Sequence, residues 1–111
     1  MDLKFSSSVG ILTLCFNPSE TVRASVLMQS LFEDEKERGN SVPNFGQDFF
    51  KDFASAEDGV NIVFNFKYLG LALRFIEEVI DNTDSDDKKK EALLRFLISA
   101  RAWYDGAHAL Q

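Results

Sequence analysis

Residues 60–82 read VNIVFNFKYLGLALRFIEEVIDN, and the spacing of the apolar side chains changes within this stretch. Over 60–68 apolar and polar residues largely alternate, which is the period of a strand with one buried face. Over 69–82 the spacing becomes helical, and the apolar side carries Leu69, Leu73, Ile76 and Ile80. The opposite side carries Arg74 and the acids that we expect it to meet, which are Glu77, Glu78 and Asp81. A strand that leads directly into a helix predicts a fold of the α+β class.

A second apolar stretch, near the start of the chain, predicts another strand. Residues 9–16 (VGILTLCF) are rich in β-branched and aromatic types, and the Asn-Pro pair at 17–18 ends them. Residues 3–5 (LKF) are suited to pair with this strand, because the serines at 6–8 and Gly10 favour a turn. The N-terminus is therefore predicted to form a single strand or a hairpin.

The clearest boundary in the chain is the start of a helix after residue 16. Asn17 suits the cap, Pro18 suits the first helical position, and Glu20 follows Asn17 at the spacing of a capping box. The helix is predicted to end at about Arg38, where Gly39 supplies a left-handed stop. Its buried stripe is predicted to be Ala24, Leu27, Met28, Leu31 and Phe32. Its last turns carry four acids that oppose the helix dipole, namely Glu33, Asp34, Glu35 and Glu37.

The remaining stretches complete a single domain of residues 1–111. After a loop, phenylalanines at a spacing of four predict a short helix over 48–56. A last helix is predicted from a cap at Thr83 or Ser85 to about Tyr104. Its core face is predicted to be Leu93, Phe96, Leu97, Ala100, Trp103 and Tyr104. The predicted architecture is a small α+β domain with an N-terminal strand or hairpin, a helix, a short helix, one central strand and two C-terminal helices.

Length, charge and cysteine content exclude several classes of protein. A chain of 111 residues has room for one compact domain. A net charge of -6 and a pI near 4.7 disfavour direct binding of nucleic acid, which requires a basic surface. No stretch approaches the roughly 20 apolar residues of a transmembrane helix, so no membrane partner is expected. The single cysteine, Cys15, excludes an intramolecular disulfide and favours the cytoplasm.

The residues that most often carry catalysis or metal binding are sparse in this chain. The single histidine, His108, lies close to the C-terminus, and Cys15 sits between apolar neighbours where packing is the simpler role. An EF-hand loop begun at Asp81 would place Asp86 where glycine is required and Ala92 where the bidentate glutamate belongs. We therefore expect no catalytic activity, no cofactor and no metal.

Charge and phenylalanine content together indicate a binding surface. Residues 17–87 carry a net charge of -9 and residues 88–111 carry +3. Most of the eleven phenylalanines fall on predicted core faces, and Phe45, Phe49 and Phe50 are left over within an acidic stretch. Aromatic side chains ringed by charges are typical of protein interfaces. The candidate partner-binding residues are Glu33, Asp34, Glu35, Glu37, Phe45, Asp48, Phe49, Phe50, Asp52, Glu57 and Asp58.

A small, acidic, single-domain protein without a catalytic constellation has the physical profile of many stoichiometric inhibitors. Bacterial toxin immunity proteins and antitoxins are of this type. The resulting hypothesis is an inhibitor that covers a basic protein, such as a nuclease toxin domain or another nucleic-acid-handling protein. The alternative is a homo-oligomeric structural or adaptor subunit, in the simplest case a homodimer, that buries the spare phenylalanines against a second copy of itself.

Overall fold

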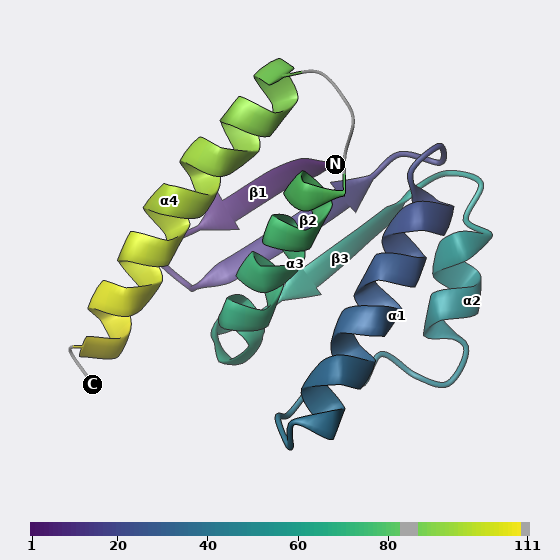
Figure 1. The fold of residues 1–111 in the computed structure, drawn as a ribbon, viewed down its shortest axis with the longest axis horizontal. Helices are drawn as coiled ribbons and strands as arrows, with labels where there is room; N and C mark the ends of the chain where they lie inside the picture. Colours follow the sequence, from purple (N-terminus) through teal and green to yellow (C-terminus); the bar gives the residue numbers. More distant parts are fainter. Residues whose placement is uncertain (83–86, 110–111) are drawn as a thin grey trace.

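The computed structural model describes residues 1–82 and 87–109, and within them a three-stranded antiparallel sheet is covered on one face by four helices (Figure 1). This is the α+β domain that the sequence predicts. In chain order the elements are β1 (Asp2–Ser6), β2 (Ile11–Phe16), α1 (Thr21–Glu37), α2 (Phe49–Ala54), β3 (Val60–Phe64), the 3₁₀ turn η1 (Phe66–Tyr68), α3 (Leu69–Asp81) and α4 (Asp87–Ala109).

The sheet has the order β1-β2-β3, so the N-terminal hairpin is confirmed and β2 is the central strand. Leu14 of β2 lies opposite Leu3 on one side and Ile62 on the other. Because side chains alternate along a strand, one face of the sheet is apolar and is buried under the helices. Its fully buried members are Leu12, Leu14, Phe16, Ile62 and Phe64.

The other face of the sheet points to solvent, which corrects the expectation for Cys15. Cys15 lies between Leu14 and Phe16, and the alternation that buries these two residues places Cys15 on the outer face, where it is half-exposed. Val63 on the same face is 53% exposed. Antiparallel sheets with one solvated face are common.

Helix α3 lies at the centre of the helical layer, and the four residues of its predicted apolar side are all buried. It packs against α1 on one side and α4 on the other, and above β2. The core is continuous through both layers, and its other helical members include Ala24, Met28, Leu31, Phe32 and Phe53.

Helix α1 starts three residues later than the sequence suggests. Residues 17–20 close a turn of their own, in which the Glu20 amide donates to the Asn17 carbonyl at 2.9 Å. The hydrogen bond expected of a capping box is nevertheless present: the Asn17 amide donates to the Glu20 carboxylate at 2.9 Å. Gly39, with φ of +80°, follows the helix as the predicted left-handed stop.

Strand β3 ends at Phe64, although the alternation of apolar residues continues to Tyr68. In the observed register Phe66 would lie opposite Gly10, which already belongs to the turn between β1 and β2. The backbone therefore turns into η1, and the Phe66 side chain packs against Gly10 and Trp103.

The two remaining helices differ from their predicted lengths. Helix α2 ends at Ala54, and α4 continues past Gly106 to Ala109. The proposed caps at Thr83 and Ser85 lie outside the described residues. On α4, Ala100 is buried, and the rest of the predicted core face is half-buried against the core.

Candidate functional site

The candidate site lies on α1, on α2 and on the loop that joins them. The two helices pack side by side and run in opposite directions (Figure 1). Phe32 of α1 contacts Phe45 of the loop, with ring centroids 6.2 Å apart, and Phe50 of α2, with centroids 5.7 Å apart. Phe45 stacks on Phe49 at 4.5 Å. One aromatic cluster therefore joins the three segments.

The three phenylalanines that the sequence predicts to lie outside the core are only partly exposed. Phe45, Phe49 and Phe50 are half-buried and pack against the core, and Phe45 also meets Phe64 of β3 edge to face at 6.1 Å. Each ring therefore covers the edge of the core on one side and remains partly accessible on the other. This is the geometry of an aromatic patch that a partner could cover.

Acidic side chains surround this aromatic cluster. Four acids there are exposed: Glu33 and Glu37 near the end of α1, Asp48 directly before α2, and Asp52 on α2. Asp34 is half-exposed and pairs with Arg38 at 3.5 Å. We use the name acidic surface for the group that the fold brings together, which is Glu33, Asp34, Glu37, Phe45, Asp48, Phe49, Phe50 and Asp52.

Glu57 and Asp58 lie at the opposite end of the helical pair. They precede Gly59, which approaches the carbonyl of Phe16 at the start of α1. Since a helix rises 1.5 Å per residue, about 20 Å separate this end of α1 from the acids of its last turn. Glu57 and Asp58 are therefore far from Glu33 and Glu37, and the acidic surface is defined without them. Asp52 lies toward their end of α1, because Ala54, two residues later, accepts a hydrogen bond from the Thr21 hydroxyl at 3.4 Å.

Glu35 is not available to a partner, which corrects its place among the candidate residues. Its side chain is buried, and its Oε1 forms an ion pair with Arg74 of α3. Its Oε2 accepts a hydrogen bond from the Asn40 side chain at 2.7 Å. Arg74 therefore meets an acid of α1 rather than the acids of its own helix, and Glu77 pairs instead with Arg101 of α4 at 3.1 Å.

The burial of Glu35 has a signal in the sequence. Glu35 continues the apolar stripe of α1, since it follows Met28 by seven residues and Leu31 by four. A carboxylate at such a position requires a buried partner, and the arginine that supplies one lies far away in the sequence. The helical period could thus have predicted that Glu35 is buried while its neighbours are exposed. It could not have predicted that Arg74 is the partner of Glu35.

A polar pocket of about 480 Å3 surrounds this ion pair, between the end of α1, η1, the start of α3 and the end of α4. The Tyr68 hydroxyl lies 3.3 Å from the Ser41 hydroxyl at its rim. This hydrogen bond, together with the nearby Lys67 ammonium, lowers the pKa of Tyr68 below its ordinary value. Around this pocket, α1, α3 and α4 are connected by polar contacts such as the Glu35–Arg74 and Glu77–Arg101 ion pairs.

No metal-ligand cluster is found among the described residues, since no three His, Cys, Asp or Glu side chains gather there in a suitable arrangement. Within the same part of the chain, no helix combines the length and the apolar character needed to span a bilayer. Comparisons of the chain with protein-family models, with curated proteins and with solved structures gave no match.

Proposed function

We propose that this protein is a stoichiometric inhibitor that binds a basic protein through the acidic surface, in the manner of a toxin immunity protein. The observation that supports the proposal is the combination, on one α1–α2 face, of exposed carboxylates with partly accessible phenylalanine rings. Aromatic anchors within a charged rim are typical of protein interfaces, and complementary charge accelerates association with the correct partner. A nuclease toxin domain is the kind of basic partner that such a surface suits.

The proposal assigns the chain no catalytic activity, and it requires no cofactor and no contact with nucleic acid or membrane. The acidic surface would occupy a basic site on the partner and keep its natural substrate away. A reducing compartment such as the cytoplasm suits a chain whose single cysteine is half-exposed and free.

The test begins with the neighbouring open reading frame: where it encodes a basic protein, that protein is purified and titrated into this protein by calorimetry. We expect one-to-one binding with a nanomolar dissociation constant that weakens as salt is added. The quadruple variant Glu33→Lys, Glu37→Lys, Asp48→Lys, Asp52→Lys should bind at least 100-fold more weakly. Glu35 stays unchanged in this variant, because its loss would disturb the fold.

The matched control reverses four acids away from the acidic surface, in the variant Glu57→Lys, Asp58→Lys, Glu78→Lys, Glu91→Lys. All four residues are exposed, and the net charge changes equally because each variant replaces four acids with four lysines. Equal weakening by the two variants would show that only overall charge matters and would remove the acidic surface as the binding site. Tight binding unaffected by either variant would contradict the proposal altogether.

Self-association is a second candidate function, supported by an apolar stripe on the outer side of α4. Leu94 and Ile98 are one helical turn apart and are 43% and 69% exposed. A homodimer that packs two α4 helices together would cover both. Sedimentation at micromolar concentration tests this alternative, since a monomer there would contradict it and a dimer lost on Ile98→Glu would support it.

A further inference from the structure

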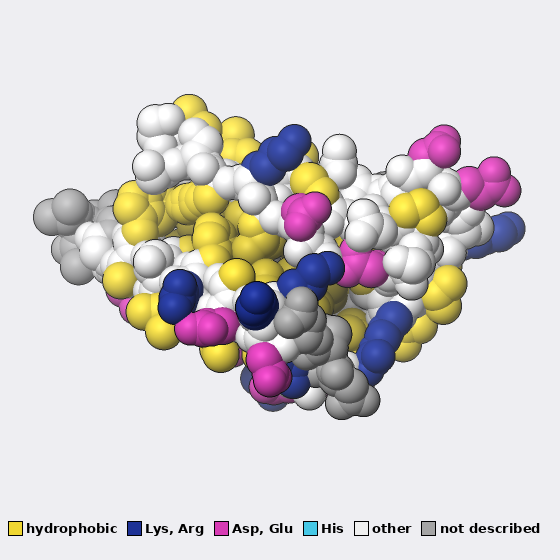
Figure 2. Space-filling model, turned by 90° about the horizontal axis from the view of Figure 1, so that it is seen from above, with side chains coloured by type: hydrophobic (Ala, Val, Ile, Leu, Met, Phe, Trp, Pro, Cys, Tyr) yellow, Lys and Arg dark blue, Asp and Glu magenta, His cyan; other side chains and the backbone are white. Residues whose placement is uncertain are grey.

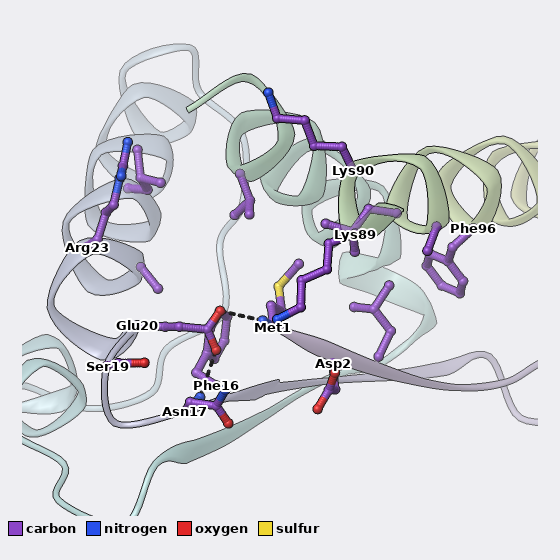
Figure 3. Close-up of a pocket in the computed structure, with 16 residues that line it drawn as sticks. Met1, Asp2, Phe16, Asn17, Ser19, Glu20, Arg23, Lys89, Lys90 and Phe96 are labelled. Carbon is purple, nitrogen blue, oxygen red and sulfur yellow. Dashed lines mark hydrogen bonds and ion pairs between the residues drawn. The ribbon is translucent and has the colours of Figure 1, made fainter. Parts of the chain in front are cut away.

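A pocket of about 640 Å3 opens where the start of α1, the end of α3, the start of α4 and the start of β1 meet (Figure 3). No residue of the acidic surface lines it. The interior is mainly apolar, and its walls include Leu3, Leu27, Val79, Leu93 and Phe96. Its volume lies in the range of small-molecule sites, about 300–1,000 Å3. Size and lining therefore suit a small ligand with a large apolar part.

The apolar surface continues beyond the pocket along α4. Phe96 lines the pocket and contacts Phe5 of β1, with ring centroids 6.0 Å apart. Phe5 in turn contacts Trp103, with centroids 5.2 Å apart. All three side chains are half-buried. Figure 2 shows a hollow lined by hydrophobic side chains on the α4 side of the molecule. From Lys89 to Trp103 this path follows the helix for about 20 Å, which suits one extended alkyl chain.

Positive charge gathers at the pocket end of this hollow. Arg23 on α1 and Lys89 and Lys90 on α4 line the pocket from opposite sides (Figure 3). Arg23 donates to the backbone carbonyl of Asn82, and among the described residues none of the three forms an ion pair with a carboxylate. In a chain with a net charge of -6, three such cations around one apolar pocket favour an anionic ligand.

Two acids line the pocket, Glu20 and Asp2, and within the described residues neither forms an ion pair with Arg23 or Lys90. The Glu20 carboxylate is occupied by the ammonium group of Met1 and by the Asn17 amide, as the dashed lines of Figure 3 show. Asp2 points away from the pocket (Figure 3), and it is exposed. The charge of Lys89 already acts on Glu20, so Arg23 and Lys90 are the cations left to a negatively charged group that enters between α1 and α4.

We propose that this pocket binds a single-chain anionic amphiphile, with a long-chain carboxylate as the simplest example. The head group would lie between Arg23 and Lys90, and the alkyl chain would follow the hollow toward Trp103. This inference is independent of the proposed inhibitor function, because it uses neither the acidic surface nor a protein partner.

The test is a titration of the intact protein with laurate, kept below the concentration at which laurate aggregates. Trp103 is the single tryptophan of the chain and lies along the hollow, so its fluorescence reports occupancy. We expect saturable one-to-one binding, confirmed by calorimetry. Each CH2 added between octanoate and laurate should strengthen binding up to about fourfold, the factor for one buried methylene.

The sign of the head group provides the sharpest control. An acidic protein attracts cationic amphiphiles non-specifically, so dodecyltrimethylammonium would bind better than laurate if the pocket played no part. We expect the reverse, with laurate or dodecyl phosphate bound at least tenfold more tightly than the cation. Equal binding of both charges, or no saturable binding of laurate, would overturn the proposal.

Variants locate the site and keep the test independent of folding. Arg23→Gln with Lys90→Gln should weaken laurate binding at least tenfold, whereas Lys36→Gln with Lys51→Gln makes the same charge change on α1 and α2 and should leave it unchanged. Circular dichroism confirms that each variant is folded. If both pairs weaken binding equally, the pocket is not the site.

Phosphatidylglycerol vesicles separate a free amphiphile from a membrane surface, since both present an apolar chain with an anionic head. We expect no co-sedimentation with such vesicles, because the chain must enter the pocket singly. Binding to vesicles without saturable binding of monomeric laurate would overturn the proposal in favour of a lipid surface.

Discussion

At the scale of the residue, Glu35 and Glu37 are two positions apart on α1 and have opposite surroundings. Glu37 is exposed near the helix end, whereas Glu35 points inward to Arg74 and Asn40. A buried ion pair costs desolvation, and its members depend on each other. Glu35 therefore connects α1 to α3, whereas the exposed side chain of Glu37 can contact a partner.

Glu35→Gln should lower the free energy of unfolding by about 2 kcal/mol at pH 7, because it leaves Arg74 without its partner. The effect falls below the roughly 3–5 kcal/mol of fully buried pairs, since the Arg74 side chain is 35% exposed. Urea unfolding measures it. Glu33→Gln is the control and should change stability by less than about 0.5 kcal/mol. Equal stability of Glu35→Gln and the parent would show that the pair is not a stabilising contact.

Glu20 should make stability depend on pH. Partial burial raises the pKa of Glu20, but hydrogen bonds from the Met1 ammonium and the Asn17 amide, with the charges of Met1 and Lys89, lower it below its ordinary value of 4.5. A carboxyl whose pKa is lowered by folding stabilises the fold above its unfolded pKa, and the contribution is lost as pH falls through the folded value.

Glu20→Gln retains an acceptor for the Asn17 amide and removes the charge. We expect it to be less stable than the parent by about 1 kcal/mol at pH 7, the scale of a helix-terminal carboxylate. The difference should begin to shrink as pH falls below about 4.5, the ordinary pKa, and should vanish below the lowered pKa of the folded parent, where Glu20 is protonated in the fold as well. Chemical unfolding at a series of pH values measures this, and a difference that stays constant would contradict the assignment.

At the scale of the element, the connection from α2 to β3 is fixed by Gly59. Gly59 has φ of +85°, and a Cβ placed there would lie 2.4 Å from the carbonyl oxygen of Phe16. Both the left-handed conformation and the close approach require glycine. The hairpin, α1 and β3 therefore meet at a point that admits no side chain.

Gly59→Ala should destabilise the protein by about 3 kcal/mol, the sum of left-handed strain and steric overlap. Gly39→Ala is the matched control, because Gly39 also has a positive φ of +80° but no atom within 4 Å of the added Cβ. It should cost about 1 kcal/mol. Thermal or urea unfolding compares the two, and equal losses would show that the contact with Phe16 is unimportant.

The spacing of apolar residues predicts the strands and helices of this fold well, because it depends only on residues close together in the sequence. The apolar side of α3 and the stop at Gly39 were predicted from the sequence and are present in the structure. The end of β3 could not be predicted, because it depends on the register with β2 and on the position of Gly10. The division of the acidic residues likewise depends on the antiparallel packing of α1 and α2.

At the scale of the whole molecule, the two ends of the helical layer are unequal. Helix α3 buries six side chains, whereas Ala100 is the one fully buried side chain on the described part of α4. Helix α4 forms one wall of the hollow through half-buried contacts, and its outer side is partly apolar. The α1–α2 side is closed by the aromatic cluster, and it carries the exposed carboxylates of the acidic surface.

We expect α4 to open before the rest of the molecule. Its backbone amides should exchange with solvent at least tenfold faster than those of α3, because local opening costs less where few apolar contacts are lost. Hydrogen exchange followed by mass spectrometry measures this for peptides of each helix. Slower exchange in α4 than in α3 would show that the helix is an integral part of the core.

The central position of β2 has a consequence for how the chain is made. The hairpin of β1 and β2 closes over a four-residue turn, but β3 can join β2 only after residues 17–59 have been synthesised. Closing so long a loop costs chain entropy, and non-local pairing of this kind slows folding. During synthesis on the ribosome, the backbone groups of β2 that pair with β3 therefore stay unpaired while α1 and α2 emerge. During this interval the nascent hairpin is the segment most exposed to pairing with other chains.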